Sequence, residues 1–208
     1  GNTSTSSTNS SEIIIDTTVP SINVITTNAF SWGAVLNTTE DNVNGTVTVT
    51  TVGVEDGQTV DIILNGQTYT ADVSSGSAAV TIPAADLQAL THASSYTVTA
   101  DVLDAAGNAA TQVISDSFSV DTTTPSPPTV SFPTSPSNNG EVNVTLATDA
   151  TTWEYSVDNG TNWTEGPSSN KFTLTQFTYV IGSIQVRNTD IAGNTSTSST
   201  NSSEIIID

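Results

Sequence analysis

The chain has 208 residues and carries 21 Asp and Glu side chains against two basic ones, Lys171 and Arg187, which gives a formal net charge of −19. This balance excludes polyanionic partners such as nucleic acid and anionic membrane surfaces. The chain has no cysteine, so disulfides and thiolate metal sites are excluded, and no apolar run reaches the roughly 20 residues that cross a bilayer. We therefore expect no membrane insertion, and we expect any bound metal ion to have oxygen ligands.

The first 16 residues, GNTSTSSTNSSEIIID, are identical to residues 193–208. An exact match of this length does not arise by chance, so the sequence repeats with a period of 192 residues, and we expect the chain to be one unit of a longer array. Residues 1–16 are then the final strand and the linker of a preceding domain. Residues 12–16 are β-branched like a strand, whereas residues 1–11 are polar and predicted to be loosely held.

Residues 17–121 alternate apolar and polar side chains in short runs, as half-buried strands require. The predicted strands are 21–26, 45–52, 58–64, 67–73, 77–82, 96–103 and 111–120. Asn65-Gly66 is a two-residue hairpin signal between two of them. The only helical pattern is a single turn at residues 84–90, and the path of the long segment between residues 26 and 44 is not readable from the sequence.

Residues 122–208 repeat this organisation, with strands predicted at 128–133, 141–147, 152–157, 161–165, 171–176, 180–187 and 196–207. A similar linker precedes each domain, because EIIIDTTVPS and FSVDTTTPSPP both join a β-branched run to an Asp, two Thr and a Pro that ends the strand. Each domain also has a D-x-A-G-N sequence, at residues 104–108 and 190–194. Seven short strands per domain indicate an all-β chain of two tandem immunoglobulin-like β-sandwich domains, 17–121 and 122–208.

An odd number of strands places the two ends of each domain at opposite poles, so the domains are expected to form an end-to-end monomeric rod. The loops then bring acidic residues to the junctions. At the start of the first domain we expect Asp16, Glu55, Asp56 and Asp104 to converge. At the start of the second we expect Asp121, Asp149 and Asp190, together with Glu40 and Asp41 from the long loop of the first domain.

Several carboxylates held close together destabilise one another unless a cation bridges them. Calcium suits such a set, because Ca²⁺ takes 6 to 8 oxygen ligands in a forgiving geometry, whereas Mg²⁺ requires a stricter octahedron. The sequence therefore predicts Ca²⁺ as the cofactor at each junction, where it would stiffen a flexible joint. A single Asp in such a loop is equally explained by turn formation.

The D-T-T-x-P linker, the D-x-A-G-N loop, and the stretches GVEDGQTVDIILNGQTYTADV and IPAADLQAL resemble the tandem immunoglobulin-like repeats of very large bacterial adhesins of the type I-secreted RTX and biofilm-associated group. The resemblance covers most of residues 16–121 and, more loosely, residues 121–208. It implies an extracellular extender module on the bacterial cell surface. Neighbouring identical repeats in the same chain would be its partners, calcium would lie at the junctions, and a distal adhesive domain would lie elsewhere in the parent protein.

Two other functions stay open at this stage. One is a ligand-binding module for a glycan or a host protein, in which Trp153, Tyr155 and Trp163 would form a stacking platform, although Trp153 and Tyr155 are more typical of core aromatics on a central strand. The other is a structural domain appended to a secreted enzyme. The chain itself is not expected to be an enzyme: its only histidine, His92, lies in a polar loop, and Ser168 and Lys171 form an S-x-x-K sequence without its companion motifs.

Overall fold

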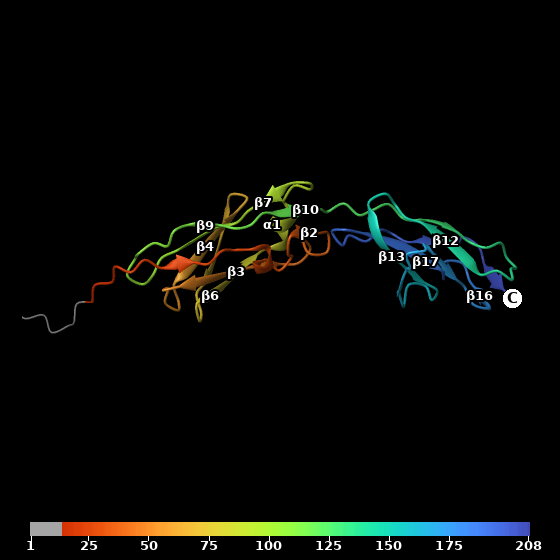
Figure 1. Ribbon diagram of the computed structural model, residues 1–208, viewed down its shortest axis with the longest axis horizontal. Helices are drawn as coiled ribbons and strands as arrows, with labels where there is room; N and C mark the ends of the chain where they lie inside the picture. The colour runs from red at the N-terminus through yellow and green to blue at the C-terminus, as the bar shows by residue number, and fades with distance from the viewer. Residues whose placement is uncertain (1–13) are drawn as a thin grey trace, which may run out of the picture. The chain divides into compact units, whose positions relative to one another are not determined.

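The computed structural model describes residues 14–208, and these residues are nearly all β (Figure 1). Of the predicted final strand and linker of a preceding domain, residues 1–16, residues 1–13 lie outside the described residues, and residues 14–16 are exposed and belong to no strand. By its internal contacts the chain divides into two compact units. Unit 1 comprises residues 14–31, Thr46–Ile82 and Thr97–Ser117, and unit 2 comprises Trp32–Gly45, Pro83–Tyr96 and Phe118–Asp208. The predicted domain boundary at Asp121 stays a prediction.

Unit 1 contains two antiparallel sheets, and buried and exposed residues alternate along several of their strands. One sheet has the order β1 (Ser21–Ile22), β3 (Gly45–Val52), β6 (Ser77–Ile82), and the other has the order β5 (Gln67–Asp72), β4 (Thr59–Leu64), β8 (Thr99–Val102), β9 (Val113–Ile114). In β4 every second residue is buried, and these residues are Val60, Ile62 and Leu64. This period of two is the one that the sequence predicts.

The hairpin between β4 and β5 has the predicted turn. Leu64 pairs with Gln67, and the two turn residues Asn65 and Gly66 have φ values of 49° and 78°. Positive φ at both central residues is typical of the turn that joins twisted antiparallel strands closely. The predicted hairpin is therefore confirmed.

The first part of unit 2 is a small sheet around β10 (Phe118–Val120). β10 pairs in parallel with β2 (Val35–Leu36) and antiparallel with β7 (Ser95–Tyr96). Phe118 is buried and meets the ring of Trp32 edge-on, with 5.2 Å between ring centroids. Helix α1 (Ala84–Gln88) forms at the predicted helical turn and buries Leu87.

The remainder of unit 2 holds three further sheets with one apolar core. Their orders are β11 (Thr129–Ser131), β12 (Glu141–Thr145), β15 (Lys171–Thr173); β14 (Thr164–Glu165), β13 (Ala150–Ser156), β17 (Gln185–Asp190), β18 (Ser199–Thr200); and β16 (Phe177–Tyr179), β19 (Ile205–Ile207). Trp153, Phe172, Ile184, Val186 and Ile205 are among the buried residues of this core. The all-β fold of sandwich-like sheets is thus confirmed.

Several features differ from the sequence expectation. The predicted strands 96–103 and 196–207 each divide between two sheets, as β7 and β8 and as β18 and β19, and residues 180–184 of the predicted strand 180–187 lie between β16 and β17. The long segment between residues 26 and 44 contains a 3-10 helix, Thr27–Ala29, and then β2, whose parallel pairing has no local sequence signal. The last predicted strand of the first domain is also divided into β9 and β10, which belong to different sheets. Ser115, between them, stays paired to Val98 because its hydroxyl accepts the Val98 N–H at 2.8 Å and its own N–H donates to the Val98 carbonyl at 2.8 Å.

Candidate functional site

The two D-x-A-G-N loops, residues 104–108 and 190–194, fold alike. In each, the carboxylate of the Asp accepts the backbone N–H and the side-chain amide of the Asn, at 2.7 and 2.8 Å for Asp104 and at 2.8 and 2.9 Å for Asp190. The glycine of each loop has φ of +90°, a conformation that other residues rarely adopt. The side-chain amide of Asn108, followed by backbone N–H groups, holds the pKa of Asp104 below its ordinary value.

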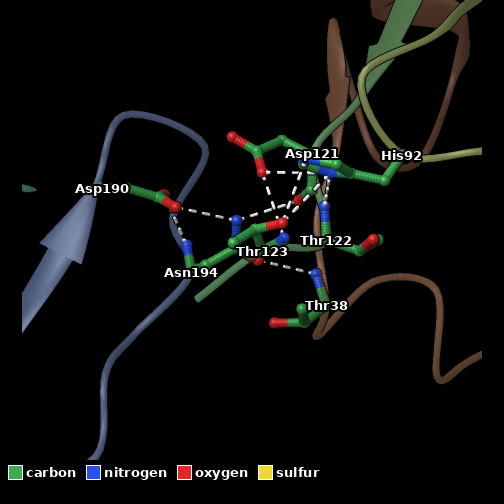
Figure 2. Close-up of polar contacts among 7 residues, drawn as sticks. All are labelled: Thr38, His92, Asp121, Thr122, Thr123, Asp190 and Asn194. Carbon is green, nitrogen blue, oxygen red and sulfur yellow. Dashed lines mark hydrogen bonds and ion pairs between the residues drawn. The ribbon is translucent and has the colours of Figure 1, made fainter. Parts of the chain in front are cut away.

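Asn194 joins the second of these loops to two other segments of unit 2 (Figure 2). Its side-chain oxygen accepts the backbone N–H of Thr38 at 2.9 Å. Its side-chain nitrogen donates to the backbone carbonyl of Asp121 at 2.9 Å as well as to Asp190. The Asn194 residue is fully buried, with 0% of its surface exposed. We call this set of contacts the Asn194 junction.

A second asparagine strengthens the same junction. The side-chain nitrogen of Asn37 donates to the carbonyl of Ala192 at 2.9 Å, and its side-chain oxygen accepts the N–H groups of Thr39 and Glu40. A Cβ added at Gly193 would lie 3.1 Å from this Asn37 nitrogen. The loop that follows β2 therefore lies directly against the loop of residues 190–194.

The linker that begins at Asp121 is held by its backbone more than by its carboxylate. The N–H of Asp121 donates to Leu36 at 2.9 Å and its carbonyl accepts from Asn194, while its carboxylate accepts the N–H of Thr123 at 3.2 Å. His92, from a loop about 30 positions earlier, contacts the linker. Its Nδ1 accepts the N–H of Thr122 at 3.1 Å and is 3.6 Å from the Asp121 carboxylate (Figure 2). His92 is thus a linker contact, and the hydroxyl of Thr123 lies 3.1 Å from its Nε2.

At the start of unit 1 the structure brings three of the four predicted acidic residues to one loop. The Glu55 carboxylate accepts the N–H of Ala105 at 2.9 Å, which places it against the loop that contains Asp104. Asp16 reaches this loop through its carbonyl, which accepts the Asn108 amide at 3.3 Å, while its carboxylate accepts the N–H of Thr18 at 2.8 Å.

The other predicted metal ligands have separate surroundings. Asp56 accepts the N–H of Ser75 at 2.7 Å, and Asp149 is exposed. Glu40 accepts the N–H of Asn37 at 3.1 Å, and Asp41 accepts the side-chain amide of Asn42 at 3.1 Å. Within residues 14–208 no group of three or more Asp, Glu or His side chains is close enough to hold a metal ion. The predicted ligand sets stay predictions.

Two of these carboxyl groups are nevertheless unfavourably placed for a negative charge. Burial raises the pKa of Asp41, whose residue is 8% exposed. Burial also raises the pKa of Glu40, and the hydrogen bond from Asn37 opposes this in part. A nearby cation would offset the cost of keeping both groups ionised.

Sequence reasoning missed the amide and backbone contacts that close the junction. It considered the Asp of each D-x-A-G-N loop as a ligand, whereas in the structure Asn194 of the second loop bonds to Thr38 and Asp121. The available signal was the repetition of Asn at the fifth position of both D-x-A-G-N loops. The position of Thr38 carried no such signal, because it depends on the parallel pairing of β2.

The aromatic residues weighed as a glycan platform are mostly internal. Trp153 is 2% exposed, and Tyr155 stacks on Phe172 with 4.0 Å between ring centroids. The guanidinium carbon of Arg187 lies 3.9 Å from the ring centroid of Trp163 and covers one of its faces. The expected core role of Trp153 and Tyr155 is confirmed. Lys171 of the S-x-x-K sequence forms an ion pair with Glu141 at 3.0 Å.

No protein-family model matches the chain, and no curated protein matches its sequence. Several solved structures are similar to the chain. One, described as a Ca²⁺-stabilized adhesin that helps an Antarctic bacterium reach out and bind ice, is 25% identical with a TM-score of 0.57, covering 91% of this chain and 49% of that one. The chain resembles bacterial adhesin repeats.

Two further solved structures are similar to the chain. A 1.5-MDa bacterial ice-binding adhesin involved in host cell surface retention is 22% identical with a TM-score of 0.54, covering 92% of this chain and 67% of that one. An immunoglobulin-like domain of the M. primoryensis ice-binding adhesin is 29% identical with a TM-score of 0.34, covering 50% of this chain and 96% of that one. The chain thus spans about two thirds of the first of these structures and about half of the Ca²⁺-stabilized adhesin. The resemblance to tandem immunoglobulin-like adhesin repeats, first noted in the sequence, is confirmed.

Among residues 14–208 there is no helix with the length and apolar character needed to span a bilayer. Helix α1, with five residues, is the only α-helix in this part of the chain.

Proposed function

We propose that this chain is a structural extender segment of a large bacterial cell-surface adhesin and has no catalytic role. In this proposal many copies of the 192-residue unit form a monomeric rod outside the cell, and the rod holds a distal adhesive domain away from the surface. The observation that carries the proposal is the Asn194 junction. A buried amide there fastens the linker at Asp121 and the loop at Thr38 to the loop of residues 190–194.

The contacts at this junction are suited to restricting a linker. Asn194 bonds to backbone groups of two segments, so the junction cannot rotate without breaking several hydrogen bonds at once. Buried donors and acceptors that lose their partners cost about 1–3 kcal/mol each, which penalises bending. The exact repeat in the sequence supports the same function, because copies of one unit add length.

The finer part of the proposal concerns calcium. The donor chemistry fits Ca²⁺, since Glu40 and Asp41 are neighbouring carboxylates whose pKa values are raised by burial. Ca²⁺ would supply the positive charge that this segment lacks, with Glu40 and Asp41 as its carboxylate ligands and Asp121 as the linker ligand to test. The solved structure described as a Ca²⁺-stabilized adhesin supports this choice of ion.

Small-angle X-ray scattering tests the extender function. A two-copy protein, residues 1–208 followed by residues 17–208, should have close to twice the maximum dimension of the single chain. The Asn194→Ala variant should bend or shorten the particle, because the linker is released. A two-copy protein that is no longer than the single chain would overturn the extender proposal.

Thermal unfolding with and without Ca²⁺ tests the calcium part separately. Ca²⁺ should raise the melting temperature of the wild-type chain, by mass action, with about 2.7 kcal/mol at a free concentration 100 times its Kd. The double variant Glu40→Gln, Asp41→Asn should lose this response. Asp116→Asn is the matched control, because Asp116 is exposed and belongs to none of the predicted ligand sets. Equal melting temperatures in Ca²⁺ and in chelator would exclude calcium and leave the extender function standing.

A further inference from the structure

The loop of residues 104–108 in unit 1 has the geometry of the Asn194 junction but lacks the partner segment. Asn108 corresponds to Asn194, and its amide makes the corresponding bonds to Asp104 and to the linker carbonyl, here that of Asp16. The side-chain oxygen of Asn108 accepts no hydrogen bond from any described residue, whereas that of Asn194 accepts the N–H of Thr38. Asn108 is half-buried where Asn194 is fully buried.

The glycines of the two loops show the same difference. Both have φ of +90°. A Cβ on Gly193 would meet the Asn37 amide at 3.1 Å, but a Cβ on Gly107 would have no described atom within 4 Å. The loop of residues 104–108 therefore presents an uncovered surface where the loop of residues 190–194 is covered by Asn37.

Unit 2 contains a segment that matches the missing partner. In the Asn194 junction, the N–H of Asp121 donates to Leu36 at 2.9 Å, and Asn37 follows directly. Near the end of unit 2, the N–H of Asp208 donates to Ser137 at 2.9 Å, and Ser137 pairs in parallel with Ile207 as Leu36 does with Val120.

Asn138 therefore occupies the place of Asn37. Asn138 is exposed, and its side chain makes no hydrogen bond within the described part of the chain, in contrast to Asn37. Asn139 occupies the place of Thr38, and its N–H is occupied by the hydroxyl of Ser137 at 3.0 Å.

The sequence repeat determines which molecule brings these segments together. Because residues 193–208 are identical to residues 1–16, Asp208 of one copy is equivalent to Asp16 of the next. We infer that the Ser137–Asn139 segment of one copy binds the 104–108 loop of the next copy of this chain. The Asn138 amide donates to the Ala106 carbonyl, and the Asn139 N–H exchanges its Ser137 hydroxyl partner for the side-chain oxygen of Asn108. The partner is a tandem copy, so the inference rests on the proposed array, and the linker supplies a high effective concentration.

Hydrogen–deuterium exchange on the two-copy protein tests this contact. Backbone amides of residues 105–108 in the second copy should exchange about three- to tenfold more slowly than in the single chain, the factor that one net hydrogen bond provides. Asn138→Ala in the first copy should restore the faster exchange. In the single chain the same variant should leave exchange and melting temperature unchanged, because the side chain has no partner there.

Asn28→Ala in the first copy is the matched control, since Asn28 is an exposed asparagine without a side-chain hydrogen bond in the described chain. It should leave the protection of the loop in place. Equal exchange of residues 105–108 in the single and two-copy proteins would overturn the inference, as would protection that survives Asn138→Ala. Failure here is distinguishable from failure of the extender function, which scattering by the same two-copy protein reports independently.

Discussion

The side-chain oxygen of Asn194 accepts a hydrogen bond of 2.9 Å from the backbone N–H of Thr38, 156 positions earlier in the chain. The same amide also donates to the carbonyl of Asp121, so one buried side chain satisfies backbone groups from two other segments. The predicted junction of carboxylates stays a prediction, whereas the structure shows a direct junction of amide and backbone groups. That junction requires no ion for its hydrogen bonds.

Replacing Asn194 by alanine should destabilise unit 2 by about 2–4 kcal/mol, because the Thr38 N–H and the Asp121 carbonyl lose a buried partner. The melting temperature should fall by about 4–16 °C, at roughly 2–4 °C for each kcal/mol. Urea unfolding and differential scanning calorimetry measure both quantities. Asn108→Ala, at the equivalent but half-buried position, is the control and should cost about 1 kcal/mol in the single chain. Equal losses for the two variants would show that Asn194 acts only within its own turn.

Asp41→Asn should stabilise the calcium-free chain at neutral pH. Burial raises the pKa of Asp41, so the folded state binds this proton more tightly than the unfolded state, whose value is near 3.8. The contribution of this group to the free energy of unfolding is therefore favourable at low pH and is lost as the pH rises through the folded pKa. The advantage of Asp41→Asn over the wild type should grow above about pH 4 and disappear below it. An advantage that does not change with pH would contradict this origin.

Asp158 should make stability depend on pH in the opposite sense to Asp41, because its pKa is lowered and not raised. Hydrogen bonds from the backbone and the side chain of Asn162, and from Ser156, lower its pKa from 3.8 to about 2. Its stabilising contribution is present above pH 3.8 and is lost as the pH falls through about 2. Asp158→Asn should therefore be less stable than the wild type at neutral pH, and the gap should close between about pH 4 and pH 2. Denaturant midpoints across this range give the comparison, and a constant gap would refute the assignment.

Gly166→Ala should destabilise unit 2 by about 3 kcal/mol, because its Cβ would overlap the indole of the buried Trp153. The Gly166 N–H donates to the Trp153 carbonyl at 2.8 Å, so the backbone cannot move away without losing this bond. Ser168→Ala is the control, since Ser168 is exposed nearby in the chain and should change stability by less than about 0.5 kcal/mol. Chemical unfolding followed by tryptophan fluorescence distinguishes the two variants; similar stabilities would mean that the core accommodates the methyl group.

The amino-acid sequence determined the strands and turns of this protein, because alternation and turn residues act over a few positions. The burial of Val60, Ile62 and Leu64, the Asn65-Gly66 hairpin and the core position of Trp153 all follow from such short-range patterns. The sequence also revealed the repeat and the equivalence of the two D-x-A-G-N loops. It predicted that Asp16, Glu55 and Asp104 converge; in the structure Glu55 and the Asp16 carbonyl contact the loop that contains Asp104, and the metal site stays a prediction.

Only the tertiary structure decided how these loops are joined. β2 has two residues and pairs in parallel with β10, a long-range pairing without a local sequence signal, yet it positions Asn37 and Thr38 against the loop of residues 190–194. The sequence places several carboxylates at one pole of a domain, but in the structure some of them accept hydrogen bonds from nearby N–H groups instead. Asp56, for example, accepts the N–H of Ser75. Hydrogen bonds act over about 3 Å, so a prediction that places residues only on a common pole cannot determine which side chain bonds to which partner.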